Sequence, residues 1–535
     1  MAHSHEEELR AKVAREINLV KQSGGRLKFA LAYPNCYRVG MSNLGIHIIY
    51  ELLNLRLGIA CERFFLPDSN KILSLESQTP LNKFQVVGFA VSFEPDYFNI
   101  VKMLKLGKIN LRASERTDFD PIIIAGGPCA TFNPEPLSEI FDAFVIGEGE
   151  VILPPLIEEI ISTENLPRLE RLERISQIAG VYVPTFPKKV FRQWLKNLDD
   201  YPAHSTILTD DAEFNMYLIE TARGCGRHCR FCMAGYCFRK PRNRSLDVLK
   251  NEIHSAKKFG KKIGLMGAAI SDYPQIDELC KFILGERLQM SVASFRADSV
   301  TFELVKSLAA SGLKTLTIAP EVGSEKMRRV INKGITEENI FTAIELGLKA
   351  GIKNFRLYFM VGLPFEELSD VEEIANLSAR VKKFCKGRLT LSVNPFVPKP
   401  FTPFQWSSFA EKKYLDAAFK ILRSQLKSTG GVEIISESIR SAQVQAILSR
   451  GDRKISEIIL QSESAQEFRK NFKATGLDEN FYLRERTLEE NLPWDFLNQG
   501  FDKKYLIEEF NRAKNLKSTP PCFEGCRRCG ICGGD

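Results

Sequence analysis

Residues 220 to 245 read ETARGCGRHCRFCMAGYCFRKPRNRS, a run with four cysteines, seven Lys or Arg residues and no acidic residue after the first. Three of the thiols, Cys225, Cys229 and Cys232, have the spacing C-x3-C-x2-C. Thiolates at this spacing can bind one four-iron cluster and leave its fourth iron without a protein ligand. The basic neighbours are expected to lower the pKa of these thiols and to favour a cluster of net negative charge. The run therefore predicts a metal centre with one iron open to chemistry.

A zinc ion is the alternative occupant of these cysteines. Structural zinc takes four ligands, so the fourth would be a residue such as Cys237 or His228. The cysteine spacing by itself permits both metals.

Six short apolar segments alternate with helical segments, and the first of them ends where this run starts. This alternation predicts a full or partial parallel barrel. The cysteine run directly follows the first of them, so it is expected on the C-terminal rim, where barrels carry their functional loops. The six predicted strands are FNMYLIET (214–221), KKIGLMGAAIS (261–271), QMSVASFR (289–296), LKTLTIAPE (313–321), NFRLYFMVGLP (354–364) and LTLSVNPFVP (389–398).

An earlier series of apolar strands and helices predicts a separate parallel sheet near the N-terminus. Its strands are buried on both faces, because they are apolar throughout rather than alternating. The predicted strands are LKFALAY (27–33), VVGFAVS (86–92), PIIIAGG (121–127) and DAFVIGEGE (142–150), and MSNLGIHIIYELLNLR (41–56) is a predicted helix.

The composition is that of a soluble globular protein, with 44% hydrophobic and 26% charged residues in 535. The first twenty residues are charged throughout, and no apolar run approaches the about 18 residues that span a bilayer. We expect a cytoplasmic protein without membrane contact, in which clustered thiols bind metal rather than form disulfides. The formal charge of +8 is mild for this length and does not by itself indicate a nucleic-acid partner.

These patterns predict an α/β protein with four regions. They are a parallel-sheet domain at 1–190, a full or partial (β/α)6 barrel at 191–410, a mostly helical region at 411–520, in which GVEIISES is a strand, and a cysteine-rich tail at 521–535.

The motif RGC-x3-C-x-F-C, with Phe231 before its last cysteine, resembles the signature of the radical S-adenosylmethionine (SAM) enzymes. The resemblance implies a [4Fe-4S] cluster on Cys225, Cys229 and Cys232, with SAM chelating the open iron. One-electron reduction then cleaves SAM to a 5′-deoxyadenosyl radical, and reduced flavodoxin or ferredoxin is the expected electron donor.

Further motifs of that family follow in its order and cover nearly 200 residues. MGAAISD around Gly267 resembles the turn for the SAM amino group, although it departs from the usual Gly-Gly-Glu. In IAPEVGSEKMRRVINKG, Glu321 resembles the acidic residue that contacts the ribose. In VGLPFEE, Gly362 and Pro364 resemble the turn beside the adenine.

AGGPCATFNPEPL followed by VIGEGE resembles the Rossmann-like N-terminal domain of radical SAM proteins described as cobalamin-binding, and the six predicted β/α units match the partial (β/α)6 barrel of the same family. The Asp-x-His-x-x-Gly motif that supplies an axial histidine is absent, and no Asp precedes His47 by two residues. The resemblance therefore implies cobalamin bound without histidine. The alternative is a domain that only packs against the barrel or shapes the substrate cleft.

The chain ends with four more thiols at C-x3-C-x2-C-x2-C, namely Cys522, Cys526, Cys529 and Cys532. Such a set can hold a structural zinc or an auxiliary [4Fe-4S] cluster, and the spacing does not separate the two. We favour iron–sulfur, because the cell must already load the first site.

Three functions follow from these expectations. With cobalamin, the resemblance implies methyl transfer to an unactivated carbon. With an auxiliary cluster and no cobalamin, sulfur insertion or dehydrogenation fits better. The alternative to an enzyme is a non-catalytic, metal-binding adaptor for RNA or protein, in which the basic run binds phosphates. The substrate is a small metabolite, a peptide or an RNA loop.

Overall fold

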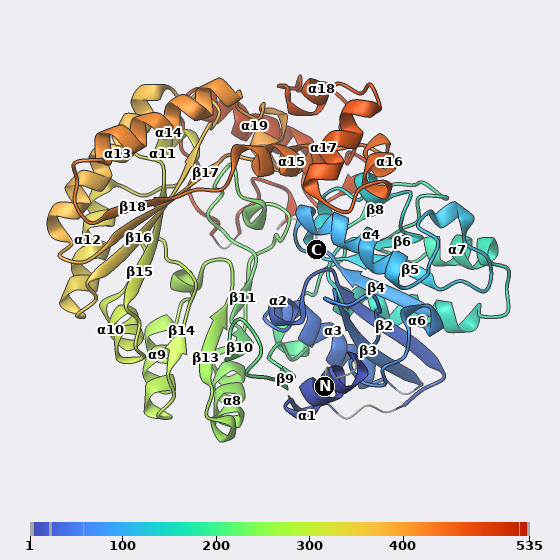
Figure 1. Cartoon of the computed structure of the whole chain (residues 1–535). Helices are drawn as coiled ribbons and strands as arrows, with labels where there is room; N and C mark the ends of the chain where they lie inside the picture. Colours follow the sequence, from blue (N-terminus) through green and yellow to red (C-terminus); the bar gives the residue numbers. More distant parts are fainter. Residues whose placement is uncertain (1–4, 21–23, 57, 524, 532–535) are drawn as a thin grey trace. The chain divides into compact units, whose positions relative to one another are not determined.

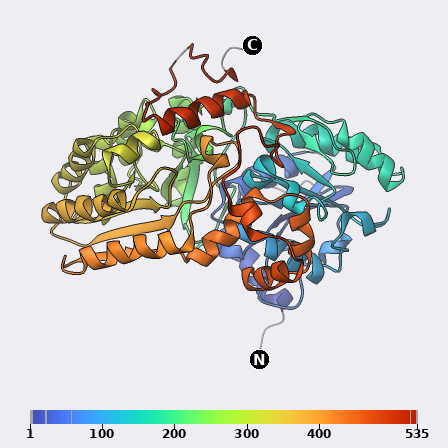
Figure 2. The ribbon, with the colours of Figure 1, turned by 90° about the horizontal axis from the view of Figure 1, so that it is seen from above.

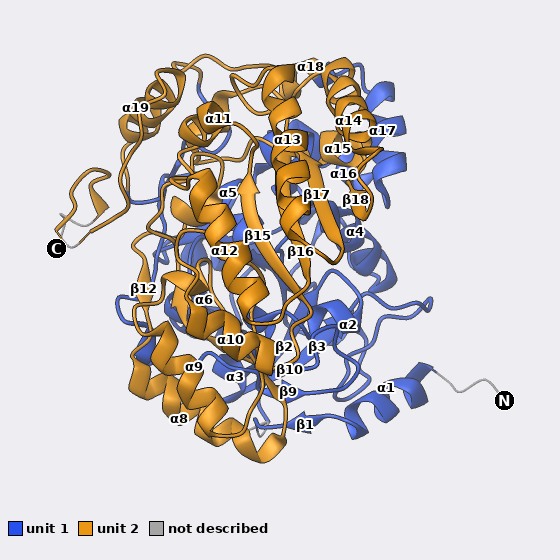
Figure 3. Ribbon diagram, turned by 90° about the vertical axis from the view of Figure 1, so that its left-hand side faces the viewer, with its two compact units in different colours: residues 1–217, 447–479, 491–500 blue, residues 218–446, 480–490, 501–535 orange. Residues whose placement is uncertain are grey.

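The computed structural model describes residues 5–20, 24–56, 58–523 and 525–531. The chain forms two compact units (Figure 3). Unit 1 comprises residues 1–217, 447–479 and 491–500, and unit 2 comprises residues 218–446, 480–490 and 501–535. The four predicted domains remain a prediction, because they are continuous stretches of sequence, whereas the two units group residues by their contacts in space.

Unit 1 contains the predicted parallel sheet, with strand order β3-β2-β4-β5-β6-β7 (Figure 1). The first five strands pair in parallel, whereas β7 is antiparallel at the edge. Strand β5 is buried at four successive positions, so both faces of the sheet are covered, as the apolar runs predict. The strands are β2 (Leu27–Tyr33), β3 (Ile59–Phe65), β4 (Val86–Ala90), β5 (Ile122–Gly126), β6 (Ala143–Val145) and β7 (Val181–Tyr182).

Late segments of the chain complete unit 1. Helix α16 (Lys454–Leu460) packs against α4 (Tyr97–Leu106), and β19 (Leu497–Asn498) pairs in parallel with β8 (Val190–Phe191). The other main helices of this unit are α3 (Leu44–Asn54), α6 (Gly149–Ser162), α7 (Arg168–Ser176) and α17 (Ala465–Ala474).

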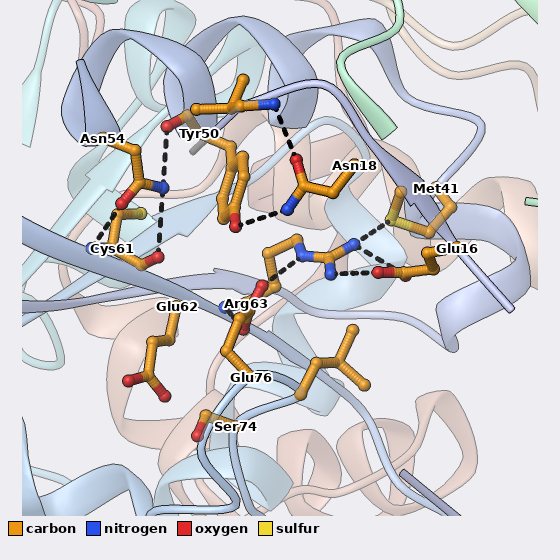
Figure 4. A network of polar contacts seen from close by, with 12 residues as sticks. Glu16, Asn18, Met41, Tyr50, Asn54, Cys61, Glu62, Arg63, Ser74 and Glu76 are labelled. Carbon is orange, nitrogen blue, oxygen red and sulfur yellow. Dashed lines mark hydrogen bonds and ion pairs between the residues drawn. The ribbon is translucent and has the colours of Figure 1, made fainter. Parts of the chain in front are cut away.

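Strand β3 carries a buried ion network that the sequence did not reveal (Figure 4). Arg63 Nη2 lies 2.6 Å from Glu16 Oε2, and Arg63 Nε lies 2.6 Å from Glu76 Oε1. The guanidinium also lies over the ring of Tyr50, 5.2 Å from its centroid. A buried arginine needs such partners, because an unpaired charge inside a protein is strongly destabilising.

Unit 2 contains five of the six predicted barrel strands and the last three residues of the first, β10, whose residues 216 and 217 belong to unit 1. Strands β10, β13 and β14 form one sheet, strands β15 to β18 form a second, and a parallel bridge between Phe295 and Ile318 joins the two series. The predicted strand in GVEIISES is β18 (Val432–Ile435), which pairs in parallel with β17. The six are β10 (Met216–Glu220), β13 (Lys262–Met266), β14 (Met290–Ser291), β15 (Thr315–Glu321), β16 (Asn354–Val361) and β17 (Leu389–Pro395).

Helices follow these strands and lie outside them in Figure 1. Helix α19 (Lys503–Lys514) packs beside α11 (Glu325–Val330), as Figure 3 shows, and Figure 2 shows the tail continuing from the end of α19. In the described part of the chain, no helix is both long and apolar enough to cross a membrane. The remaining helices of the series are α8 (Leu246–Ala256), α9 (Ile276–Gly285), α10 (Phe302–Ala310), α12 (Glu337–Lys349), α13 (Leu368–Phe384) and α14 (Lys412–Leu426).

Candidate functional site

The loop that carries the first three cysteines begins where β10 ends. A short antiparallel ribbon of β11 (Ala222–Arg223) and β12 (Arg242–Asn243) closes it. Gly224 has a φ of +84°, and a Cβ there would lie 2.1 Å from the carbonyl oxygen of Phe238, so only glycine fits. We call residues 224–241 the cysteine loop.

Burial controls the acidity of two thiols in this loop. Burial and then the neighbouring Cys229 raise the pKa of Cys232 to about 12, and the same two causes raise the pKa of Cys225. The basic neighbours act in the predicted direction, since Arg296 lowers the pKa of Cys225 and Lys333 lowers that of Cys232. The cost of burying a thiolate is larger, so the net pKa of both thiols is raised.

Two buried cations nevertheless lie beside Cys229. Arg296 Nη1 is 3.6 Å from Cys229 Sγ, and its Nη2 donates to the carbonyl oxygen of Lys333 at 2.5 Å. Lys333 Nζ in turn lies 2.9 Å from Glu321 Oε1 and 6.0 Å from the ring centroid of Phe231. The structure thus gathers Phe231 and Glu321 around one lysine next to the cysteines.

This donor set suits an anionic iron–sulfur cluster. Three thiols supply its ligands, and the buried guanidinium and ammonium groups offset its negative charge. Among the described residues, no three His, Cys, Asp or Glu side chains lie close enough to share a metal ion. Binding a cluster here therefore requires the three thiols to turn toward one another.

Arg227 ties the cysteine loop to the ends of the neighbouring strands. Its Nη2 lies 2.5 Å from Asp272 Oδ1, and its Nη1 lies 3.0 Å from Asp298 Oδ2. The hydrogen bonds that Arg227 donates to Asp272, which are the largest influence, raise the pKa of Arg227 above its usual value. Arg227 and Asp272 line a cavity of about 550 Å³ together with Ser271, Ser299 and Thr301.

Gly267 follows β13 at a point of close packing. A Cβ there would lie 2.9 Å from Ile270 Cδ1 and 3.2 Å from the carbonyl oxygen of Ala222, which belongs to β11. The turn therefore lies close against the start of the cysteine loop, and a side chain at residue 267 would require its neighbours to shift.

Gly362 and Pro364 line a second cavity, of about 420 Å³. The amide of Gly362, whose φ is +82°, donates to Glu366 Oε1 at 2.7 Å, and the hydroxyl of Tyr414 donates to the same oxygen at 2.9 Å. Burial raises the pKa of Glu366 to about 7. The sequence did not single out Glu366, because its burial depends on Tyr414, 48 residues further along the chain.

The tail returns to the cysteine loop. The amide of Cys522 donates to the carbonyl oxygen of Gly226 at 2.8 Å, and Cys522 Sγ lies 3.2 Å from His228 Nε2. Burial, followed by the charge of Arg239, lowers the pKa of His228 to about 3, so its ring is neutral. Cys526 and Cys529 are also described, whereas Cys532 lies outside the described residues.

Comparison with known proteins identifies the family. Residues 45–184 match the family described as radical SAM proteins, N-terminal, and residues 219–378 match the radical SAM superfamily. The chain belongs to the radical SAM superfamily. Membership implies a [4Fe-4S] cluster, SAM and a source of electrons, and it supports the enzyme interpretation over the non-catalytic adaptor.

One relative matches this chain over most of the length of both proteins. Uncharacterized protein MJ0966 of Methanocaldococcus jannaschii is 35% identical over 438 residues, which are 80% of this chain and 90% of that protein. A putative methylthiotransferase of the same organism, MJ0865, is 26% identical over 46% of this chain and 55% of its own length. The tRNA-2-methylthio-N(6)-dimethylallyladenosine synthase of Pelagibacter ubique is 25% identical over 45% of this chain and 53% of its own length. The chain spans about half the length of these two proteins.

Solved structures share the fold. The radical SAM methyltransferase TsrM from Kitasatospora setae, with cobalamin and a [4Fe-4S] cluster bound, has a TM-score of 0.53 at 13% identity and covers 84% of this chain and 100% of that one. The cobalamin-dependent SAM radical enzyme OxsB, in its apo form, has a TM-score of 0.50 at 18% identity and covers 78% of this chain and 58% of that one. These likenesses confirm the predicted architecture of a Rossmann-like sheet followed by a partial barrel.

Proposed function

We propose that Cys225, Cys229 and Cys232 bind the catalytic [4Fe-4S] cluster of a radical SAM enzyme. The observation that carries this proposal is the pair of buried cations, Arg296 and Lys333, beside Cys229 at the end of the first barrel strand. When bound, the cluster supplies an electron that cleaves SAM into methionine and a 5′-deoxyadenosyl radical. The arginine and lysine would stabilise the anionic centre and keep water from it.

We assign the contacts to SAM to the residues that resemble the family motifs. Glu321 lies next to the cysteine loop through its ion pair with Lys333, and Gly362 and Pro364 line the cavity of about 420 Å³. Phe231 and Gly267 complete the set, because the first lies near Lys333 and the second packs against the strand before the loop.

The reaction that we favour is cobalamin-dependent methyl transfer to an unactivated carbon. Its support is the parallel sheet of unit 1 and the shared fold with TsrM, whose structure holds cobalamin and a [4Fe-4S] cluster. His47 does not offer an axial ligand, because it is buried with Nε2 3.1 Å from the carbonyl oxygen of Met41 and Nδ1 3.3 Å from the amide of Thr206. Cobalamin would therefore bind without histidine.

Sulfur insertion is the second candidate. Two observations favour it, namely the methylthiotransferases among the relatives and the tail cysteines beside the cysteine loop. We propose that Cys522, Cys526, Cys529 and Cys532 bind a second centre, which is iron–sulfur or zinc. Reduced flavodoxin or ferredoxin is the proposed electron donor.

The test is an anaerobic assay of the protein reconstituted with iron and sulfide. SAM and dithionite are added with and without cobalamin, and 5′-deoxyadenosine and S-adenosylhomocysteine are measured by mass spectrometry. We expect 5′-deoxyadenosine from the native chain and from Cys280→Ala, a buried cysteine in α9, and none from the triple variant Cys225→Ala, Cys229→Ala, Cys232→Ala.

The second product separates the candidate reactions. Cobalamin-dependent S-adenosylhomocysteine supports methyl transfer, whereas 5′-deoxyadenosine without it favours sulfur insertion or dehydrogenation. Equal 5′-deoxyadenosine from the triple variant would overturn the assignment of the catalytic cysteines.

A further inference from the structure

The tail is fixed to the cysteine loop by specific buried contacts. The amide of Thr519 donates to Asn332 Oδ1 at 2.8 Å, and Asn332 Nδ2 donates back to the carbonyl oxygen of Thr519 at 3.0 Å. The same Nδ2 donates to the carbonyl oxygen of His228 at 3.2 Å. One asparagine therefore joins the start of the tail to the middle of the cysteine loop.

Arg230 makes a second connection from between two predicted cluster ligands. Its Nη2 donates to the carbonyl oxygen of Lys517 at 2.6 Å, and its Nε lies 3.1 Å from Glu509 Oε2. Arg230 is fully buried, so both contacts are shielded from water. The tail is thus held where Cys522 meets the loop.

The His228 ring is oriented as a metal ligand would be. Its Nε2 lies 3.2 Å from Cys522 Sγ, and its Nδ1 lies 2.5 Å from the hydroxyl of Tyr505. With bonds of about 2.3 Å to sulfur and about 2.0 Å to nitrogen, two ligands of one tetrahedral metal lie about 3.5 Å apart. Ligating histidines commonly have their other nitrogen held by a hydrogen-bond partner, which here is Tyr505.

A cation lies beside both groups. Arg239 Nη2 is 2.8 Å from each of the two ring nitrogens of His228 and 3.3 Å from Cys522 Sγ, so one positive group contacts the ring and the thiol. At the next cysteine of the tail, Arg528 Nε donates to Cys526 Sγ at 3.2 Å. The guanidinium of Arg239 therefore occupies space beside His228 and Cys522, and a metal ion can take that space when the arginine side chain turns away.

We propose that His228 takes the fourth ligand position of the tail centre in place of Cys532, beside Cys522, Cys526 and Cys529, so that the cysteine loop supplies a ligand to a second centre. The centre is a thiolate–imidazole site for an iron–sulfur cluster or a zinc ion, which use these same donors. The inference rests on the proposal that the tail binds metal. His228 and Cys522 are already close, and the other two thiols must turn toward them.

The test uses the full chain with Cys225→Ala, Cys229→Ala and Cys232→Ala, so that only the tail centre remains. Into this background are placed His228→Asn, Cys522→Ala and, as a matched control, His254→Asn on the exposed face of α8. His228 has a φ of +56°, and asparagine tolerates that conformation, so His228→Asn removes the imidazole while preserving the backbone. Circular dichroism and thermal unfolding verify that each variant folds.

Metal, sulfide and the ligand shell are then measured after anaerobic reconstitution. Iron is examined by pulsed EPR with ¹⁵N-histidine, and zinc by X-ray absorption. We expect a histidine nitrogen on the tail metal in the background and in His254→Asn. In His228→Asn we expect that nitrogen to be lost and metal release to a chelator to be at least about tenfold faster.

The possible failures are distinct. Metal retained in His228→Asn with an unchanged ligand shell would overturn the role of His228 while leaving metal in the tail. Metal retained in Cys522→Ala, or no metal in the background, would overturn the tail centre itself and His228 with it. Sulfide in the centre identifies an iron–sulfur cluster, and its absence with bound zinc identifies zinc.

Discussion

At the scale of single residues, Lys333 shows how a charge is kept inside unit 2. Its ammonium group is buried, which disfavours the charged form, yet Glu321 and Cys229 raise its pKa above the usual value. The ion pair with Glu321, at 2.9 Å, therefore stabilises the charge in a place that water does not reach. Lys333 therefore keeps its positive charge beside Cys229 despite its burial.

We predict that Lys333→Met lowers the free energy of unfolding by about 3 kcal/mol, because it leaves the carboxylate of Glu321 buried beside an apolar side chain. The double variant Lys333→Met, Glu321→Gln should recover most of that loss, since no buried charge is left unpaired. Urea unfolding of the metal-free protein measures both. A single variant as stable as the native chain would contradict the prediction.

Glu366 gives a pH dependence whose sign follows from its environment. Burial raises its pKa from the usual 4.5 to about 7, so the folded protein holds the proton more tightly than the unfolded chain does. Between about pH 4.5 and pH 7 the contribution of Glu366 to stability therefore falls as the pH rises, by at most about 3 kcal/mol.

We predict that Glu366→Gln removes this contribution. In Glu366→Gln the free energy of unfolding should fall less between pH 5 and pH 7 than it does in the native chain. In Glu411→Gln, a change at an exposed residue that lines the same cavity, the fall should equal that of the native chain. Thermal and urea unfolding at both pH values measure the effect. The same pH slope in the native chain and in Glu366→Gln would show that Glu366 is not the group responsible.

At the scale of elements, apolar runs predicted eleven strands of the three main sheets, because a short apolar run can be recognised without information from distant parts of the chain. Strand β3 was missed, because Glu62 and Arg63 interrupt its apolar run IACERFF. Both are buried, and Arg63 is paired with Glu16, which is 47 residues away. Sequence patterns indicate buried positions only where the buried residues are apolar. A strand that is stabilised by buried ion pairs is therefore not recognised from the sequence.

The residues of the candidate site also fall into two groups, those that local spacing in the sequence indicates and those that only the fold brings together. The spacing of Cys225, Cys229 and Cys232 is local and could be recognised, as could the glycine turns at the ends of strands. The approach of Cys522 to His228 spans 294 residues and depends on how α19 packs, which no pattern along the chain indicates.

The turn after β15 is predicted to be intolerant of any side chain. A Cβ on Gly323 would lie 2.1 Å from the amide nitrogen of Ile374 in α13, and backbone cannot move aside as a side chain can. We expect Gly323→Ala to lower the free energy of unfolding by about 3 kcal/mol or more. Gly285→Ala, at the end of α9 with open space around it, should be neutral or stabilising by up to about 1 kcal/mol. Equal stability of the two variants would contradict this packing.

At the scale of the whole molecule, the chain leaves unit 1 at residue 217 and returns to it twice. Changes of pattern along the sequence show where one kind of structure ends, but not where a later segment packs. The returning segments fill positions in the core of unit 1. The ring of Phe468 lies 5.6 Å from that of Phe98, and Asn133 Nδ2 donates to the carbonyl oxygen of Gly451 at 2.8 Å.

We therefore predict that residues 1–217 alone do not fold cooperatively. Without α16 and α17 the ring of Phe98 loses apolar cover, and the buried amide of Asn133 loses an acceptor, which is costly inside a protein. Calorimetry should show no cooperative transition, and the fragment should bind a hydrophobic dye. A matched chain in which residues 447–500 follow residue 217 through a flexible linker should regain the transition, because it restores both contacts. The prediction is contradicted if the short fragment unfolds cooperatively at the same midpoint temperature as the linked chain. The returning segments would then lie on the surface of unit 1 without being needed for its core.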